Sequence, residues 1–353
     1  MKKLLALLLT AGLALGALTG CAGKTASSEP SSVPETSSQA SSAASEQPSS
    51  APAEKTAVSL AGLKGPTGFG MVKLMSDSES KSTANDYTVT IAGAADEITA
   101  KLIKGELDIA AVPTNLAAVL YQKSNGGVQI LNVNTLGVLY MLTKNEEITD
   151  WSQLKGKTIY STGKGAMPEY VLNFLLEKNG LDPEKDVTVE YLSEHSELAS
   201  KMIASTEPMI AVLPQPFVTQ VTMKDDTIKK ALDLTEEWNK ATNNESVLSM
   251  GCIVVNKAFA DAHPDAVDAF RTEYKASVEY TNEHPADAAQ LIEKYGMLAN
   301  AKMAEKAIPA CHITYMDGAE MKSKLTGLFE VLYAANPESV GGALPDDAFY
   351  YSK

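Results

Sequence analysis

The stretch Gly105-Glu-Leu-Asp-Ile-Ala-Ala-Val-Pro-Thr-Asn-Leu116 decides the fold of this chain. The mostly apolar run Leu107–Val112 has the length and composition of a strand buried in a parallel sheet. Pro113 lacks the N–H that a sheet ladder needs and therefore ends the strand, and we expect Thr114 and Asn115 to cap a following helix. Such a turn presents backbone N–H groups and hydroxyls at the carboxyl end of a sheet, where open α/β folds bind ligands. The stretch thus predicts an α/β protein with a ligand site at this turn.

Three stretches carry a family resemblance, and they stand in the right order along the chain. They are Gly105-Glu-Leu-Asp-Ile-Ala with its Pro-Thr-Asn helix start, Leu154-Lys-Gly-Lys-Thr-Ile159, and Ile210-Ala-Val-Leu-Pro-Gln-Pro-Phe217. They resemble the first lobe, the entry to the second lobe and the second lobe's strand-to-helix turn in the substrate-binding proteins of ABC importers, in the nitrate/sulfonate/taurine (pyrimidine-precursor-like) class. The resemblance spans Val58 to Phe329.

The resemblance implies an α/β, two-lobed type II periplasmic-binding-protein fold, with a mostly parallel sheet flanked by helices in each lobe. We place the first part of lobe 1 at 57–140, lobe 2 at 141–250, and the return part of lobe 1 with the C-terminal helices at 251–353. Two crossover strands would join the lobes, at Leu136–Leu142 and Val247–Val255. The resemblance further implies a monomer that closes on a small ligand and docks on a membrane permease driven by an ATPase.

The amino-terminal segment has the features of a secreted lipoprotein. Two lysines and an apolar run make residues 1–20 a signal peptide, and Leu18-Thr19-Gly20-Cys21 resembles a bacterial lipobox. The alternatives are an uncleaved anchor and a plain secretory signal. The rest of 21–56 is rich in Ser, Ala, Pro and Glu, and it has too few large apolar residues to fold, so we predict a disordered tether. We expect lipidated Cys21 (palmitate) to hold the protein on the extracytoplasmic face of the cell membrane, with no membrane contact besides this anchor.

Other strand ends also carry polar turns that suit a ligand. Pro66 fits a first helical turn, and Ser161-Thr-Gly-Lys-Gly-Ala166 combines hydroxyls, glycines, a lysine and a helix start, which favours an anion. His195 is a further candidate, with a surface histidine near a helix cap as the alternative. The predicted ligand-binding residues are Pro66, Thr67, Gly68, Asp96, Pro113, Thr114, Asn115 and Asn134 in lobe 1, and Thr162, Gly163, Lys164, Gly165, Pro214 and Gln215 in lobe 2.

The sequence provides no positive argument for catalysis. The four histidines lack metal-ligand spacing, and no nucleophile elbow or Cys–His pair occurs. Gly156-Lys157-Thr158 is not a Walker A motif, because Trp151 stands where that motif needs a glycine. We therefore predict no enzyme activity, no cofactor and no metal. A ligand-sensing lipoprotein without transport, and an extracytoplasmic enzyme on the same fold, remain the alternatives.

The net charge, the single arginine and the cysteines limit which partners and ligands the protein can bind. The net charge of −14 argues against nucleic acid as a partner. The sole arginine, Arg271, lies in the late helical region, where we expect it to pair with a local acid, so we predict no bidentate clamp for a carboxylate. An anion held by backbone N–H groups and Lys164, and a neutral heterocycle, both remain open as ligands. Cys252 and Cys311 are predicted to be two separate buried thiols rather than a disulfide.

Overall fold

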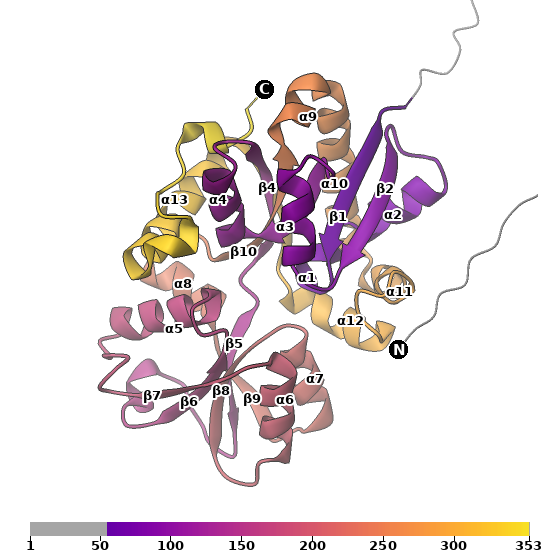
Figure 1. Ribbon diagram of the computed structural model, residues 1–353. Helices are drawn as coiled ribbons and strands as arrows, with labels where there is room; N and C mark the ends of the chain where they lie inside the picture. Colours follow the sequence, from indigo (N-terminus) through magenta and orange to yellow (C-terminus); the bar gives the residue numbers. More distant parts are fainter. Residues whose placement is uncertain (1–54, 353) are drawn as a thin grey trace, which may run out of the picture. The chain divides into compact units, whose positions relative to one another are not determined.

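The computed structural model describes residues 55–352. The predicted signal peptide, the lipidation of Cys21 and most of the predicted tether lie outside these described residues. Within them the chain forms two β-sheets with helices packed against them (Figure 1). The six-stranded sheet with its helices is called lobe 1 below, and the five-stranded sheet with its helices is called lobe 2.

Both sheets are mixed. From edge to edge, the lobe 1 sheet contains β11 (Ile313–Met316), β4 (Val128–Leu136), β10 (Ser249–Asn256), β3 (Ile109–Pro113), β1 (Ala57–Leu63) and β2 (Asp86–Ala92). The lobe 2 sheet contains β7 (Thr188–Leu192), β6 (Thr158–Thr162), β8 (Met209–Pro214), β5 (Leu139–Lys144) and β9 (Ile228–Asp233). Parallel pairs join β1 to β2 and β3, and β6 to β7 and β8. The remaining pairs are antiparallel.

The predicted mostly parallel sheets are confirmed by strand direction, since β1 to β4 run one way in lobe 1 and β6 to β9 run one way in lobe 2. The strand that arrives from the other lobe lies antiparallel between its neighbours, with β10 between β3 and β4 and β5 between β8 and β9. The reason is the short link between the lobes. The link from the end of β4 at Leu136 to the start of β5 at Leu139 is only two residues long, and Leu139 lies opposite Pro214 at the end of β8. Strand β5 therefore starts at the edge where β8 ends and runs antiparallel to it.

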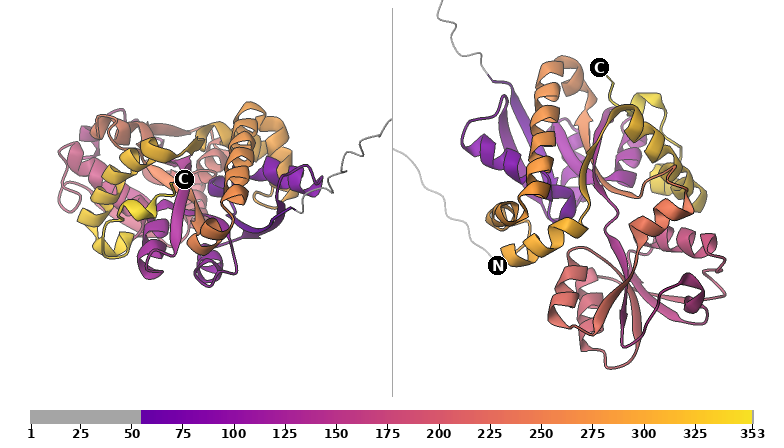
Figure 2. Two further views of the ribbon diagram at one scale, coloured as in Figure 1. Left: turned by 90° about the horizontal axis from the view of Figure 1, so that it is seen from above. Right: turned by 180° about the vertical axis from the view of Figure 1, so that it is seen from behind.

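Helices cover the sheets from two sides, as Figure 2 shows from above and behind. In lobe 1, α3 (Asp96–Ile103), α4 (Thr114–Lys123) and α13 (Gly318–Ala335) pack on one face. The other face carries α1 (Pro66–Phe69), α2 (Val72–Glu79), α9 (Lys257–Ala262), α10 (Pro264–Glu283), α11 (Pro285–Lys294) and α12 (Ala301–Ala307). In lobe 2, α5 (Met167–Lys178) and α8 (Leu234–Ala241) lie on one face, and α6 (His195–Ala204) and α7 (Phe217–Lys224) on the other. Short 3₁₀ turns occupy Trp151–Leu154, Ile308–Ala310, Pro337–Val340 and Asp347–Phe349.

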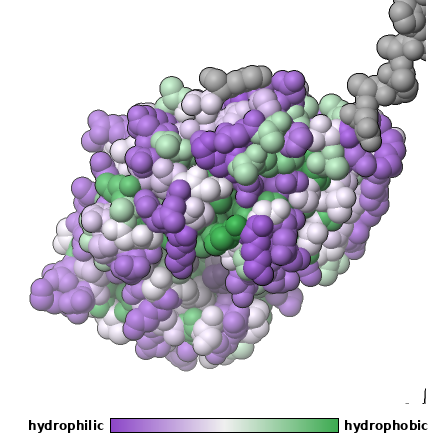
Figure 3. Space-filling model, turned by 45° about the horizontal axis from the view of Figure 1, so that its top comes forward, coloured by the Kyte–Doolittle hydropathy of each residue, from purple (hydrophilic) through white to green (hydrophobic). Residues whose placement is uncertain are grey.

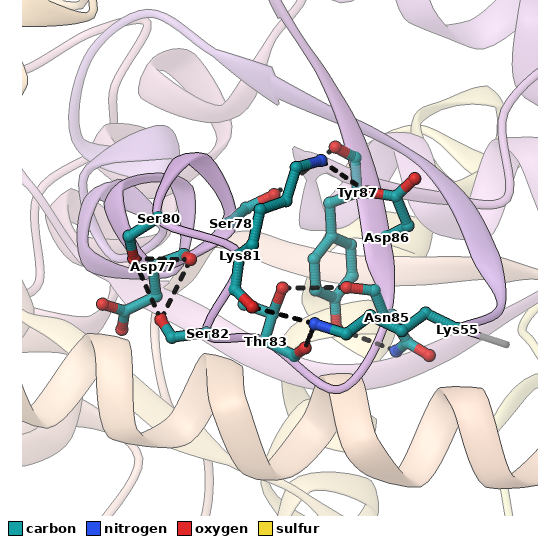
Figure 4. Close-up of polar contacts among 10 residues, drawn as sticks. All are labelled: Lys55, Asp77, Ser78, Ser80, Lys81, Ser82, Thr83, Asn85, Asp86 and Tyr87. Carbon is teal, nitrogen blue, oxygen red and sulfur yellow. Dashed lines mark hydrogen bonds and ion pairs between the residues drawn. The ribbon is translucent and has the colours of Figure 1, made fainter. Parts of the chain in front are cut away.

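The described chain begins at the amino-terminal edge of β1. Lys55 donates from Nζ to the backbone oxygens of Lys81, at 2.9 Å, and Thr83 in the loop between α2 and β2 (Figure 4). The same loop is closed by Thr83 Oγ1 donating to Asn85 O at 2.8 Å. Because β1 and β2 are parallel, this edge is opposite to the carboxyl ends of both strands, where ligand-binding turns were predicted.

One face of the molecule is largely hydrophilic. Hydrophilic side chains cover most of the face shown in Figure 3, with hydrophobic ones scattered among them. The large apolar side chains that are most exposed are Ile103 on α3, Met223 on α7, Tyr333 on α13 and Leu344 in the loop after Pro337–Val340. Between residues 55 and 352, no helix combines the length and the apolar character that crossing a bilayer demands.

The helix start at the deciding stretch differs from the prediction. The strand is confirmed as β3, but α4 begins at Thr114 itself, and the preceding Pro113 makes no side-chain cap. Thr114 and Asn115 are the first two residues of α4 and so lie past its N-cap position, and their side chains contact Ser249 Oγ and the backbone oxygen of Ser339 instead.

The connections between the sheets are shorter than the predicted crossovers. Residues 139–142 already belong to β5 of lobe 2, and most of Val247–Val255 belongs to β10 of lobe 1. The chain therefore passes from one sheet to the other at residues 137–138 and returns after α8 at residues 242–248. The elements β9, α8 and β11 were not predicted from sequence patterns.

Candidate functional site

Five polar side chains gather at the strand ends of lobe 1, and we call them the first polar set: Thr67, Thr114, Asn134, Thr135 and Ser249. Thr114 Oγ1 and Ser249 Oγ lie 2.7 Å apart, which joins the turn after β3 to the start of β10. Asn134 Nδ2 donates to the backbone oxygen of Thr67 at 2.9 Å, and its Oδ1 accepts from Thr135 Oγ1 at 3.0 Å. Burial of these groups makes each hydrogen bond costly to lose.

Close packing fixes the first polar set. A Cβ at Gly251 would lie 2.6 Å from Asn134 Oδ1 and 2.8 Å from Thr67 Cγ2. Only a glycine lets β10 approach these two side chains without displacing them. Sequence reasoning did not select Ser249, Gly251 or Thr135, because their neighbours in space come from distant parts of the chain.

The second polar set lies at the strand ends of lobe 2 and consists of Thr162, His195 and the loop Gly163–Gly165. Thr162 Oγ1 and His195 Nδ1 lie 2.6 Å apart, and the ring of His195 lies 5.5 Å from that of Phe217. Burial lowers the pKa of His195, so its imidazole is neutral at pH 7. A neutral imidazole and a hydroxyl can both donate and accept hydrogen bonds.

The glycine loop of lobe 2 is less open to an anion than the sequence suggested. The backbone N–H of Gly165 donates to Glu169 Oε2 at 2.5 Å, so a carboxylate of α5 already occupies that amide. Tyr170 Oη donates to Gly165 O at 3.0 Å. Lys164 is exposed, and its Nζ lies 6.0 Å from the ring centroid of Tyr191. The loop therefore carries one exposed cation, and an acid already occupies one of its amides.

Gln215 is held in place by hydrogen bonds with Val138 and Thr219. Its backbone N–H donates to Val138 O at 2.9 Å, and its Oε1 accepts from Thr219 N at 3.2 Å and Thr219 Oγ1 at 2.8 Å. The side chain lines a groove between α7 of lobe 2 and α12 of lobe 1. Pro214 ends β8 directly before it.

Four other predicted residues make contacts within the chain. Asp96 is exposed in the first turn of α3, where Oδ1 accepts from Glu97 N at 3.1 Å. Gly68 is buried so closely against Leu63 O that a Cβ would lie 2.0 Å from it. Asn115 donates to Ser339 O at 3.3 Å and so binds the C-terminal segment. Pro66 begins α1, and its backbone oxygen accepts from Thr135 at 3.5 Å.

The rare residues behave as predicted. Arg271 Nη2 lies 2.8 Å from Asp317 Oδ2, so the local pairing is confirmed, and Cys252 and Cys311 are free and buried. Desolvation raises the pKa of both thiols, which keeps them protonated and unreactive. In the part of the chain that the structure describes, no three residues among His, Cys, Asp and Glu are grouped to hold a metal ion.

Comparison with known proteins gives this architecture a context. Residues 128–288 match the family model described as NMT1/THI5 like. The candidate binding protein YtlA of Bacillus subtilis is 24% identical over 277 residues, which cover 64% of this chain and 82% of that protein. The crystal structure of an ABC transporter from Parabacteroides distasonis superposes with a TM-score of 0.70 at 23% identity, over 85% of this chain and 100% of that one. The protein has the periplasmic-binding-protein fold.

A second solved structure with this fold agrees. The periplasmic aliphatic sulphonate binding protein SsuA of Escherichia coli gives a TM-score of 0.65 at 14% identity, over 85% of this chain and 93% of that one. The two-lobed α/β architecture and the resemblance to substrate-binding proteins of ABC importers are thereby confirmed. These relatives carry the names of transporters and binding proteins rather than of enzymes.

Proposed function

We propose that the protein is an extracytoplasmic solute-binding lipoprotein, which captures a small organic or anionic solute between its lobes and delivers it to the permease of an ABC importer. The observation that carries the proposal is the pair of polar sets. One lies at the strand ends of each sheet, and within residues 55–352 two short connections join the lobes.

A solute bound by both polar sets would favour closure of the lobes. It contacts both only when the lobes come together, so it binds the closed arrangement more tightly than the open one. The residues between the sheets, 137–138 and 242–248, are the segments that would change their backbone angles. The closed form would then be the one that the permease recognises.

The side chains of the two polar sets determine which kind of solute could bind. They offer hydroxyls, an amide and a neutral imidazole, whereas the guanidinium of Arg271 is engaged with Asp317. Hydrogen bonds rather than a bidentate ion pair would therefore hold the solute. A sulfonate and a neutral heterocycle both present acceptors for such donors, and sulfonates are what the names of several relatives of this fold record.

The predicted lipid anchor completes the proposal. Lys55 fixes the chain at the lobe 1 edge opposite the carboxyl ends of β1 and β2, so a tether attached there leaves the polar sets free. Cys21→Ser should release the protein from the membrane fraction and abolish labelling by a palmitate analogue. A Cys21→Ser protein that stays in the membrane fraction would contradict the anchor but not the solute binding.

Thermal unfolding against a compound panel tests solute capture. The panel should hold sulfonates, nitrate, aromatic carboxylates, pyrimidines, riboflavin and amino acids. A solute present at 100 times its dissociation constant stabilises the fold by about 2.7 kcal/mol, which raises the melting temperature by several degrees. We expect one compound class to do this and to be recovered with unchanged mass.

Two matched variants test whether the ligand-induced rise in melting temperature depends on the first polar set. Thr114→Val removes a buried hydroxyl at the proposed site, and Thr188→Val makes the same change at the exposed start of β7. Only the first should reduce the ligand-induced shift. Conversion of a compound would indicate an enzyme instead. A shift that Thr114→Val leaves unchanged would place the solute elsewhere.

A further inference from the structure

The two connections between the lobes meet at Gly137, and a histidine of lobe 1 lies against the same residue. A Cβ at Gly137 would lie 2.2 Å from Thr235 Oγ1 and 2.9 Å from Leu248 Cδ2 in the second connection. His312, which directly precedes β11, donates from Nδ1 to Gly137 O at 2.5 Å. Its backbone oxygen accepts from Leu136 N at 3.1 Å. His312 therefore binds the first connection through both its side chain and its backbone.

The side chain of His312 also faces lobe 2. Its ring is stacked with that of Tyr140 on β5, with the ring centroids 6.4 Å apart, and Tyr140 Oη donates to Ala310 O at 3.0 Å. Its Nε2 lies 3.9 Å from Asp233 Oδ2 at the end of β9. Asp233 is itself held in place, because it is the N-cap of α8 and its Oδ1 accepts from Thr235 N at 2.8 Å. One ring nitrogen thus contacts the connection, and the other faces a carboxylate of the other lobe.

The hydrogen bond to Gly137 determines which nitrogen of the neutral imidazole carries the proton. A carbonyl oxygen only accepts, so the proton is on Nδ1 and Nε2 has a lone pair. In this form Nε2 and the carboxylate of Asp233 are both acceptors and cannot share a hydrogen bond. Uptake of a proton at Nε2 places an imidazolium 3.9 Å from the carboxylate. Even at the dielectric constant of water, attraction between unit charges about 4 Å apart is equivalent to about fivefold in an equilibrium constant.

Histidine is the residue type in this region whose charge ordinarily changes between pH 5 and 8. Burial raises the pKa of Tyr140 and that of the Cys311 thiol, so both stay protonated in this range. Asp233 is the charged group that lies within ion-pair distance of the imidazole. The charged or titratable groups around the two stacked rings are Asp233, Glu236, Lys230 and Tyr140 from lobe 2, and Cys311 and Lys306 from lobe 1.

We propose that protonation of His312 stabilises the lobe arrangement of this structure by pairing lobe 1 with Asp233 of lobe 2. Rotation of lobe 2 about residues 137–138 changes the distance between His312 and Asp233, so the charge on one imidazole biases the equilibrium between lobe arrangements. This effect needs no bound solute. Where a solute shifts the same equilibrium, a consequence that rests on the proposed function, its affinity is linked to proton uptake.

Distances between spin labels on the two lobes test the proposal in the absence of solute. Lys101→Cys on α3 and Lys178→Cys on α5 provide exposed positions for the labels. The Cys21→Ser chain is the parent protein, and Cys252 and Cys311 stay unlabelled because they are buried. From pH 8 to pH 5.5, the population at the interlobe distance of this structure should rise about fivefold relative to other distances.

Two variants should abolish this rise without disturbing the local fold. Asp233→Asn removes the charge and keeps an oxygen that caps α8. His312→Asn removes the imidazole at a backbone φ of 46°, a left-handed conformation in which asparagine is enriched. His284→Gln is the matched control, because it removes an exposed imidazole of lobe 1 between α10 and α11, and it should retain the full rise.

Three outcomes of the distance measurement would overturn the proposal. They are an unchanged distance distribution in the parent protein, a rise that persists in Asp233→Asn or His312→Asn, and a loss in His284→Gln equal to theirs. Nitrogen-15 NMR of the imidazole is an independent measurement that needs no variant. At pH 8 it should show the proton on Nδ1, and a proton on Nε2 would contradict the mechanism. A compound panel without any hit would count against solute capture and leave these outcomes unaffected.

Discussion

Gly251→Ala is the sharpest structural test of the first polar set. The added Cβ would lie 2.6 Å from Asn134 Oδ1, about 0.8 Å inside the 3.4 Å at which ordinary contacts begin. It would also lie 2.8 Å from Thr67 Cγ2. Asn134 is 1% exposed and hydrogen-bonded at both ends of its amide, so it has no free space into which to move.

The expected cost follows from these contacts. Overpacking of this kind destabilises a protein by about 1–3 kcal/mol, and breaking the Asn134–Thr67 hydrogen bond adds about 1 kcal/mol. For a folded part of this size, a loss of about 2–4 kcal/mol lowers the melting temperature by about 4–8 °C. The affinity for the solute should fall as well, because Asn134 and Thr67 both shift.

Differential scanning calorimetry with a matched control measures the effect. Gly93→Ala is the control, because its Cβ would meet only Glu97 Oε1, at 3.4 Å on an exposed loop, and its melting temperature should barely change. A Gly251→Ala protein that melts within about 1 °C of the unchanged protein would refute the steric argument, since even 1 kcal/mol moves the midpoint by about 2 °C.

Three smaller predictions follow from single contacts. Thr114→Val should cost about 1 kcal/mol in urea unfolding, and a double-mutant cycle with Ser249→Ala should give a coupling of about 0.5–1.5 kcal/mol, whereas additivity would exclude the hydrogen bond. Because the pKa of His195 is lowered in the folded state, its contribution to stability is complete above pH 6.5 and is lost as the pH falls below that value. The melting temperature of His195→Gln should therefore depend less on pH between 7.5 and 5.5. Equal slopes of melting temperature against pH in the two proteins would contradict this. Hydrogen bonds from Lys144 and Thr227 lower the pKa of Asp225 to about 2. Its contribution to stability is therefore present above the unfolded pKa of about 3.9 and is lost as the pH falls toward 2. In Asp225→Asn the urea midpoint should change less with pH in that range, and an unchanged dependence would argue against the Lys144–Asp225 pair.

The sequence by itself determined the local elements and their order. The apolar run before Pro113 and the glycine- and proline-marked turns predicted the strand–turn–helix units, because such signals act over a few residues. The edge strand β9 escaped prediction because Lys229 and Lys230 interrupt its apolar pattern. β11 escaped because it is only four residues long.

Only the tertiary structure decided how the polar residues are used. Thr114 reads as a helix cap, yet its hydroxyl meets that of Ser249, 135 positions later in the chain. The sequence predicts Gln215 as a contact in the solute site, and only the tertiary structure adds that it lines a groove together with Lys306 of the other lobe. A side-chain hydrogen bond depends on which partner arrives within about 3 Å, and that partner is set by packing between distant segments rather than by local pattern.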